Sequence, residues 1–173
     1  MALTDVRCSV LLRHAFDPSA PARSKAAQSY EPLLLGRPDA HVWVPQREKA
    51  DCGLAALAMV ALRSGVRVGV EELRRKAAPG AEGLSLKQPR LLAGEIGLPR
   101  QSARVSVDRL GQVGLPVIAH LGDGHYVVLH ELGPGGVVVG DPATGIATWS
   151  RELLTRSCSG SLLLFENVGG EKQ

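Results

Sequence analysis

The sequence predicts an α+β fold in which N-terminal helices pack on a C-terminal antiparallel β-sheet. In the first half, apolar residues after Asp51 recur at helical spacing. In the second half, short runs of β-branched and apolar residues are separated by turn sequences. The chain has 173 residues, which is enough for one domain with its own core. Helices followed by strands are typical of the α+β class.

Three parts of the chain are expected from its composition. Residues 1–41 mix prolines with serine and alanine and sustain no period, which predicts an N-terminal arm of unknown role. The folded domain is expected over residues 42–166. Residues 167–173, which end in "GGEKQ", are predicted to form a flexible tail.

The first predicted helix carries a cysteine at its start. Leucines and alanines recur from Leu54 to Leu62, and Gly65 ends the pattern, so Cys52 falls in the first turn. Further helices are predicted in "GVEELRRKA" and in "GLSLKQPRLLAGEIGL", the latter interrupted or started at Pro89. A short fourth helix is expected in "VSVDRLGQVG".

The strands are predicted to follow one another as an antiparallel meander. The runs "LPVIAHL", "HYVVLHEL", "GVVVGD" and "GIATWS" are separated by the turn sequences "GDG", "GPGG" and "PATG". After a brief helical turn in "RELLTR", the run "SLLLFEN" predicts one more strand.

Composition and charge exclude several classes of function. The net charge is +3, but no Lys/Arg block with interleaved aromatic residues is present, so nucleic-acid binding is not expected. Three cysteines at wide spacing give no zinc or disulfide framework and indicate a reducing compartment. No run reaches the roughly 20 apolar residues that span a bilayer, and no signal-peptide core is present. A cytoplasmic location without membrane-spanning segments is expected.

Cys52 is a candidate nucleophile. A thiol attacks a carbonyl as the thiolate, and the N–H groups and dipole of a helix start stabilise that anion. The alternative is a small, buried core thiol, because alanines and leucines surround Cys52 in the sequence.

Three further positions suit a partner role for this thiol. His125 follows a tight Gly-Asp-Gly turn, where its side chain can project into a cleft, whereas His120 and His130 are rivals that spacing alone does not exclude. Asp141 ends a strand before a proline, so it either caps that turn or accepts a hydrogen bond from the histidine ring. Gln46 is either an oxyanion donor or a solvated loop glutamine.

The order of these motifs resembles a known family. A glutamine, then "DCG" with a helix, then "GHYVVL" and then "DPATG" are similar to the papain-like cysteine peptidases that process bacteriocins at double-glycine leaders. In that family the peptidase is usually the cytosolic N-terminal domain of an ABC exporter. The resemblance implies Cys52 as nucleophile, His125 as general base and acid, Asp141 as orienting group and Gln46 as oxyanion donor. It implies no cofactor and no metal.

The resemblance also implies a function and its partners. We expect a cysteine endopeptidase that cleaves leaders after a double-glycine-type motif, in maturation of ribosomally made secreted peptides. Its substrate would be a precursor peptide with an amphipathic helical leader. No GxxxxGK[ST] motif occurs, so we expect a stand-alone peptidase, with export by an ABC exporter or secretion system in trans. The alternatives are a leader-binding docking module without turnover and a papain-like acyltransferase.

Overall fold

The computed structural model describes residues 41–77 and 87–166. The predicted arm, apart from His41, lies outside the described residues, and so does the predicted tail at 167–173. The start of the predicted helix in "GLSLKQPRLLAGEIGL" also falls outside them.

The predicted helices of the first half are confirmed. A 3₁₀ turn, η1 (Lys49–Asp51), leads directly into α2 (Cys52–Arg63), and Gly65 follows with a positive φ of 78° that suits glycine. The two next helices are α3 (Val70–Lys76) and α4 (Lys87–Glu95). The predicted fourth helix is instead a 3₁₀ helix, η2 (Val107–Gln112).

A six-stranded sheet, antiparallel throughout, forms the second half, in the order β1-β6-β2-β3-β4-β5. Its strands are β1 (Arg100–Arg104), β2 (Val117–Leu121), β3 (Tyr126–Gly133), β4 (Gly136–Asp141), β5 (Gly145–Trp149) and β6 (Cys158–Phe165). The meander from β2 to β5 is confirmed, and the predicted last strand, β6, follows the helix α5 (Arg151–Ser157) and pairs with β2. The sequence did not predict β1, because its residues are mainly polar and exposed.

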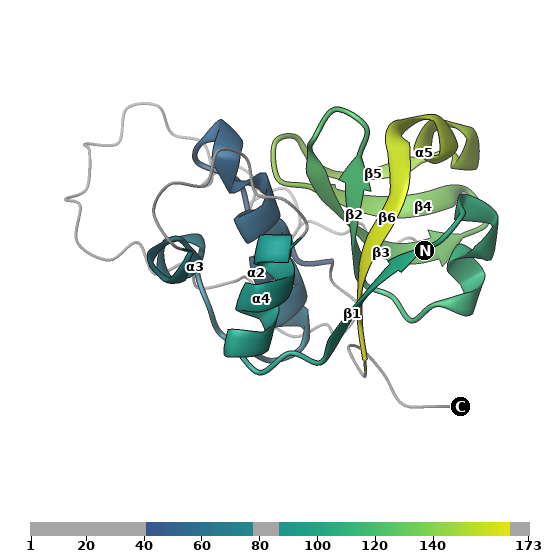
Figure 1. The fold of residues 1–173 in the computed structure, drawn as a ribbon. Helices are drawn as coiled ribbons and strands as arrows, with labels where there is room; N and C mark the ends of the chain where they lie inside the picture. Colours follow the sequence, from purple (N-terminus) through teal and green to yellow (C-terminus); the bar gives the residue numbers. More distant parts are fainter. Residues whose placement is uncertain (1–40, 78–86, 167–173) are drawn as a thin grey trace, which may run out of the picture. The chain divides into compact units, whose positions relative to one another are not determined.

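Apolar side chains cover both faces of the central strands. One cluster joins α2, α3 and α4 to alternate strand residues, which include Ile118, Tyr126 and Val128. A second cluster contains residues of η2 and α5 together with the intervening strand residues, such as Ala119 and Val127. Figure 1 shows α2, α3 and α4 gathered on one side of the sheet. The sheet therefore has two buried faces, and α2 contacts the face that carries Tyr126.

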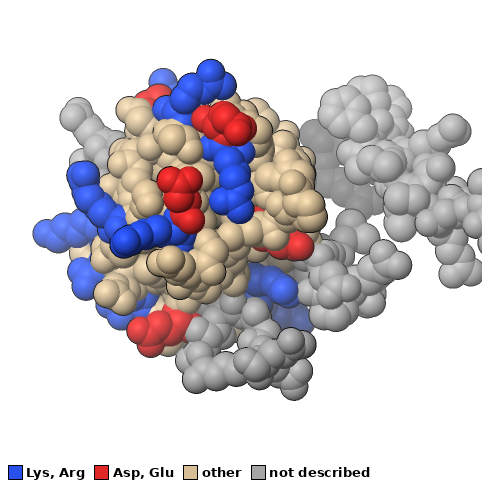
Figure 2. Space-filling view, turned by 90° about the vertical axis from the view of Figure 1, so that its right-hand side faces the viewer, with Lys and Arg blue, Asp and Glu red and all other residues tan. Residues whose placement is uncertain are grey.

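Charged side chains are dispersed on the face of the molecule turned to the viewer in Figure 2. Lysines and arginines alternate there with acidic and uncharged residues and form no continuous basic patch. In the part of the chain that the structure describes, no helix is long and apolar enough to cross a membrane.

Leu57 provides a test of the packing of α2. Its side chain is fully buried in the cluster between α2 and the sheet, so Leu57→Ala is expected to lower the free energy of unfolding by about 2–5 kcal/mol. Leu91→Ala, on α4, is the matched control because Leu91 is 48% exposed, and a change within about 0.5 kcal/mol is expected. Urea unfolding measures both. Equal losses in the two variants would contradict the described position of α2.

Candidate active site

Cys52 is the first residue of α2 and is 7% exposed. The 3₁₀ turn leads directly into the helix, and the thiol lies in its first turn, where the main-chain N–H groups have no partner within α2. Its side chain is hydrogen-bonded to His125. The side chain is thus buried, as expected for a core cysteine, but it is also hydrogen-bonded to a titratable group, the His125 ring.

His125 lies between Cys52 and Asp141. It directly precedes β3, which begins one residue later than the sequence predicted, and its main-chain N–H donates to Asp123 Oδ1 (3.1 Å). Its Nε2 is 2.7 Å from Asp141 Oδ1, which leaves Nδ1 as the ring nitrogen for Cys52. The hydrogen bond to Cys52 is the largest contribution that raises the pKa of His125 to about 9; burial opposes it, and Asp141 adds to it. The ring is therefore an imidazolium at neutral pH.

Asp141, the last residue of β4, accepts hydrogen bonds both from the turn that follows it and from the His125 ring. Its Oδ1 accepts hydrogen bonds from the His125 ring and from the Ala143 N–H (2.8 Å), and its Oδ2 accepts from Thr144 Oγ1 (3.0 Å). Burial acts to raise the pKa of Asp141, but these hydrogen bonds, led by that of His125, lower it overall. Asp141 therefore both caps the turn that follows it and accepts a hydrogen bond from the histidine ring, the two alternatives that the sequence left open.

Gln46 is held against the turn that follows Asp141. Its main-chain N–H donates to the Pro142 carbonyl (2.9 Å). The side-chain oxygen is buried and has no hydrogen-bond partner among the described residues. A solvated loop glutamine would not bury this atom, so the geometry favours a carboxamide directed into the protein.

The two rival histidines lie in other surroundings. His120 Nδ1 is 3.2 Å from Ser159 Oγ, and its ring packs at 4.9 Å from Tyr126. His130 lies in the middle of β3, with its ring 5.3 Å from that of His41. Burial is the main cause that lowers the pKa of His130 to about 4, and the nearby His41 and Arg63 add to it. Of the three candidates, His125 is the one that the structure brings to both Cys52 and Asp141.

Sequence reasoning missed two aromatic residues at the site. The Trp43 indole N–H donates to the Asp141 carbonyl (2.8 Å), which ties the segment before Gln46 to the end of β4. Tyr126 is fully buried, and its burial, with a contribution from Cys52, raises its pKa to about 12. An aromatic residue next to a candidate histidine was the available signal in "GHYVVL".

The described residues contain no group of three or more His, Cys, Asp or Glu side chains that could hold a metal ion. What they bring together is a cysteine at a helix start, a histidine ring and a carboxylate. Chemically, this arrangement suits nucleophilic attack by sulfur with proton transfer through the imidazole.

The fold, with α2, α3 and α4 on one face of an antiparallel sheet and the cysteine at the start of α2, is that of the papain-like peptidases. Within that class the chain belongs to the Peptidase C39 family, whose model matches residues 40–168. This is a family of cysteine peptidases.

Two relatives from Escherichia coli are much longer than this chain. The chain is 33% identical over 120 residues to the probable microcin-H47 secretion/processing ATP-binding protein MchF of Escherichia coli. The aligned residues make up 69% of this chain and 17% of that protein. It is 34% identical over 120 residues to the colicin V secretion/processing ATP-binding protein CvaB of Escherichia coli, again 17% of that protein. The chain thus corresponds to a small part of these relatives.

Solved structures match over nearly their full length. A double-glycine-motif protease from an AMS/PCAT transporter, in complex with the leader peptide, has a TM-score of 0.69 and 28% identity, and covers 78% of this chain and 96% of that structure. The peptidase domain of Streptococcus ComA, at 23% identity, shares the fold with a TM-score of 0.67, over 73% of this chain and 98% of that domain.

The lowered pKa of His130 predicts a pH dependence of stability. The pKa is about 4 in the folded state and about 6.5 in an unfolded chain, so the unfolded state binds more protons between these pH values. The free energy of unfolding should therefore fall as the pH falls from about 6.5 to about 4. His130→Gln should reduce this slope by up to about 1.4 kcal/mol per pH unit, measured by urea unfolding across the window.

His120→Gln is the matched control, because His120 lies on the neighbouring strand and away from the ring pair of His130 and His41. It should keep the wild-type slope. A slope in His130→Gln that equals the wild-type slope would show that another group titrates.

Proposed function

We propose that this chain is a cysteine endopeptidase that cleaves leader peptides after a double-glycine-type motif, in maturation of ribosomally made secreted peptides. The observation that carries the proposal is the position of His125, which is hydrogen-bonded to Cys52 and lies 2.7 Å from Asp141. The similarity to a double-glycine-motif protease solved with its leader peptide supports the choice of substrate.

The proposed reaction is acyl transfer through a Cys-His-Asp triad. The Cys52 thiolate, whose proton resides on the His125 ring, attacks the carbonyl carbon of the second glycine, and the electron pair of the C=O bond moves to oxygen. Gln46 and the Cys52 N–H donate to this oxyanion. The His125 imidazolium then protonates the leaving amine as the C–N bond breaks, and the neutral ring next takes a proton from the water that hydrolyses the thioester.

The electrostatics of the described site support these roles. A pKa of about 9 keeps His125 protonated at neutral pH, so the acid for the leaving amine is present before substrate binds. The Asp141 carboxylate, with its lowered pKa, stays ionised and orients the ring through Nε2. Its bonds to Ala143 and Thr144 fix the carboxylate, which limits reorganisation during the reaction.

Substrate and partners follow from the same proposal. A precursor peptide with an amphipathic helical leader would supply affinity through its apolar face, while the residues at the scissile bond are small. An ABC exporter or another secretion system is the proposed partner, since several relatives are secretion/processing ATP-binding proteins. The proposed place of action is the cytoplasm, where precursor peptides are made.

Cys52→Ala should abolish cleavage of double-glycine leader peptides and leave leader binding unchanged, because the thiolate acts in the chemical step. Mass spectrometry of the products measures cleavage, and fluorescence anisotropy of a labelled leader measures binding. Mass spectrometry also identifies the acceptor, because hydrolysis adds water to the released acyl group and transfer to an amine does not.

Iodoacetamide gives an independent test of the nucleophile. It should label Cys52 ahead of Cys8 and Cys158 near neutral pH in the wild-type protein. Cys158→Ser serves as the control and should keep full cleavage, since the Cys158 thiol faces the His120 carbonyl rather than His125. Equal labelling of all three cysteines, or an active Cys52→Ala variant, would remove the nucleophile assignment.

Replacement of the second leader glycine tests the proposed specificity. A narrow channel to Cys52 would tolerate alanine with a modest loss of rate and would refuse valine or leucine, whose added methyl groups meet packed side chains. Kinetic constants for a peptide series with Gly, Ala, Val and Leu at this position measure the effect. Rapid cleavage after leucine would indicate a general cysteine peptidase and contradict the leader-processing proposal.

A further inference from the structure

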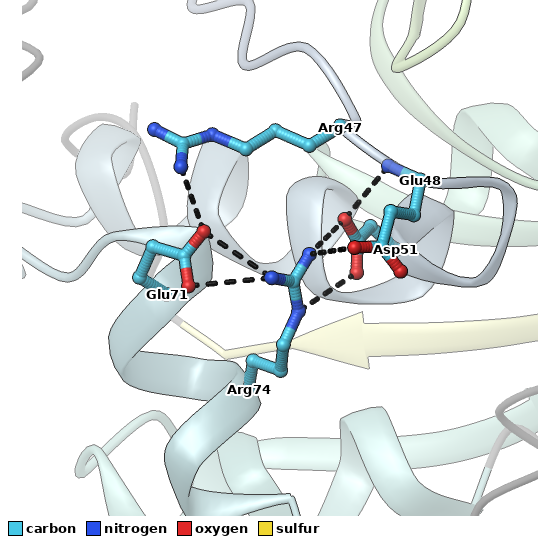
Figure 3. A network of polar contacts seen from close by, with 5 residues as sticks. All are labelled: Arg47, Glu48, Asp51, Glu71 and Arg74. Carbon is cyan, nitrogen blue, oxygen red and sulfur yellow. Dashed lines mark hydrogen bonds and ion pairs between the residues drawn. The ribbon is translucent and has the colours of Figure 1, made fainter. Parts of the chain in front are cut away.

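A buried carboxylate next to the nucleophile has no part in the proposed mechanism. Asp51, which directly precedes Cys52, is 3% exposed. Burying a charge is unfavourable unless it is paired and hydrogen-bonded. Its Oδ2 accepts a hydrogen bond from the Glu48 main-chain N–H (2.9 Å), and both of its oxygens contact the Arg74 guanidinium. Figure 3 shows this two-pronged contact.

Arg74 comes from a different helix, α3, and connects Asp51 to further charges. Its Nη1 donates to both oxygens of Glu71 (3.2 and 3.3 Å), and Glu71 Oε1 also accepts from Arg47 (2.7 Å). The pKa of Arg74 is raised, chiefly by its hydrogen bond to Asp51. We refer to Arg47, Glu48, Asp51, Glu71 and Arg74 as the Arg74 network (Figure 3).

The Arg74 network spans the segment between two proposed catalytic groups. Residues 47–51 lie directly between Gln46 and Cys52, and the network ties this segment to α3 at Arg47 and at Asp51. Before the segment, the Gln46 N–H is bonded to the Pro142 carbonyl (2.9 Å). The segment is therefore held to α3 at both of its ends, and the residue before it is held to the turn between β4 and β5.

The acid–base pair is supported from elsewhere. The charges and hydrogen bonds that raise the pKa of His125 come from Cys52 and Asp141. None of the five residues of the Arg74 network is among these contributions.

We propose that Arg74, through its contact with Asp51, is a positioning residue that aligns the oxyanion donors, Gln46 and the Cys52 N–H, without taking part in thiolate formation. This inference rests on the proposed function, because an oxyanion site has a use only in acyl transfer.

Two reagents separate the oxyanion site from the thiolate. In alkylation by iodoacetamide, the sulfur displaces iodide from a saturated carbon and no oxyanion forms. With a peptide aldehyde that ends in glycinal, the sulfur adds to the carbonyl carbon. The electron pair of the C=O bond moves to oxygen, which then takes a proton from His125. Only the second reaction uses the oxyanion donors. Protection of Cys52 from alkylation by the aldehyde measures its affinity without turnover.

Arg74→Met should weaken the affinity for the aldehyde about tenfold or more, short of the roughly 100- to 1,000-fold for loss of a whole oxyanion donor. The rate of alkylation of Cys52 without aldehyde should stay within about twofold. In cleavage assays kcat should fall in parallel while KM changes little. Arg74→Lys, which keeps the charge but cannot form the fork, should give an intermediate loss.

Arg75→Met is the matched control. It removes the same charge one residue further along α3, from an exposed side chain with no ion pair recorded in the described part of the chain. Wild-type values are expected for all readouts. Circular dichroism and thermal melting establish that each variant is folded.

The double variant Asp51→Asn/Arg74→Met tests whether the effect of Arg74→Met comes from lost positioning of the oxyanion donors or from the unpaired buried charge of Asp51. It removes both charges, so it should fold even where Arg74→Met does not. Persistent weak aldehyde affinity in the folded double variant is expected, since the link to α3 is still absent. Restored affinity, or alkylation that slows as much as aldehyde binding weakens, would overturn the inference. A wild-type protein that binds the aldehyde but cleaves no double-glycine leader would refute the proposed function alone.

Discussion

The packing of α2 against the sheet is the constraint on which the other features of the site depend. Ten consecutive residues, Cys52 to Ala61, are buried, so this helix has no exposed face in its first three turns and cannot rotate without disrupting the core. Its partner strand β3 begins at Tyr126, which belongs to the same apolar cluster. The start of the helix and the start of the strand are thereby brought together, and these starts carry Cys52 and His125.

Asp141 and Gln46 lie at the end of a strand and in a loop, and hydrogen bonds to main-chain carbonyls hold these two segments together. The end of β4 is tied to the segment before α2 by the bond from Trp43 to the Asp141 carbonyl and by that from Gln46 to the Pro142 carbonyl. Asp141 itself stabilises its own turn and accepts from His125. One carboxylate therefore sets both the local backbone and the orientation of the ring, so these two functions cannot vary independently.

Local periodicity predicted the helices, four strands of the meander and the last strand, since each depends on the spacing of apolar residues within one segment. It could not predict β1, whose exposed polar residues form a strand only because β6 returns to pair with them. Arg74 was also missed: it reaches Asp51 across 23 positions, and such a long-range ion pair has no local pattern. Gln46 and Asp141 were found by the order of motifs rather than by spacing alone.

His125, directly before β3, and His130, in the middle of that strand, illustrate how surroundings, and not residue type, decide the chemistry. His125 has an anionic partner and a thiol, and its pKa is raised to about 9. His130, five residues along, is buried beside His41 and Arg63, and its pKa is lowered to about 4. At neutral pH the first is a proton donor and the second a neutral, half-buried ring. A residue scan of "HYVVLH" could not assign these states, because the carboxylate that distinguishes them comes from the neighbouring strand.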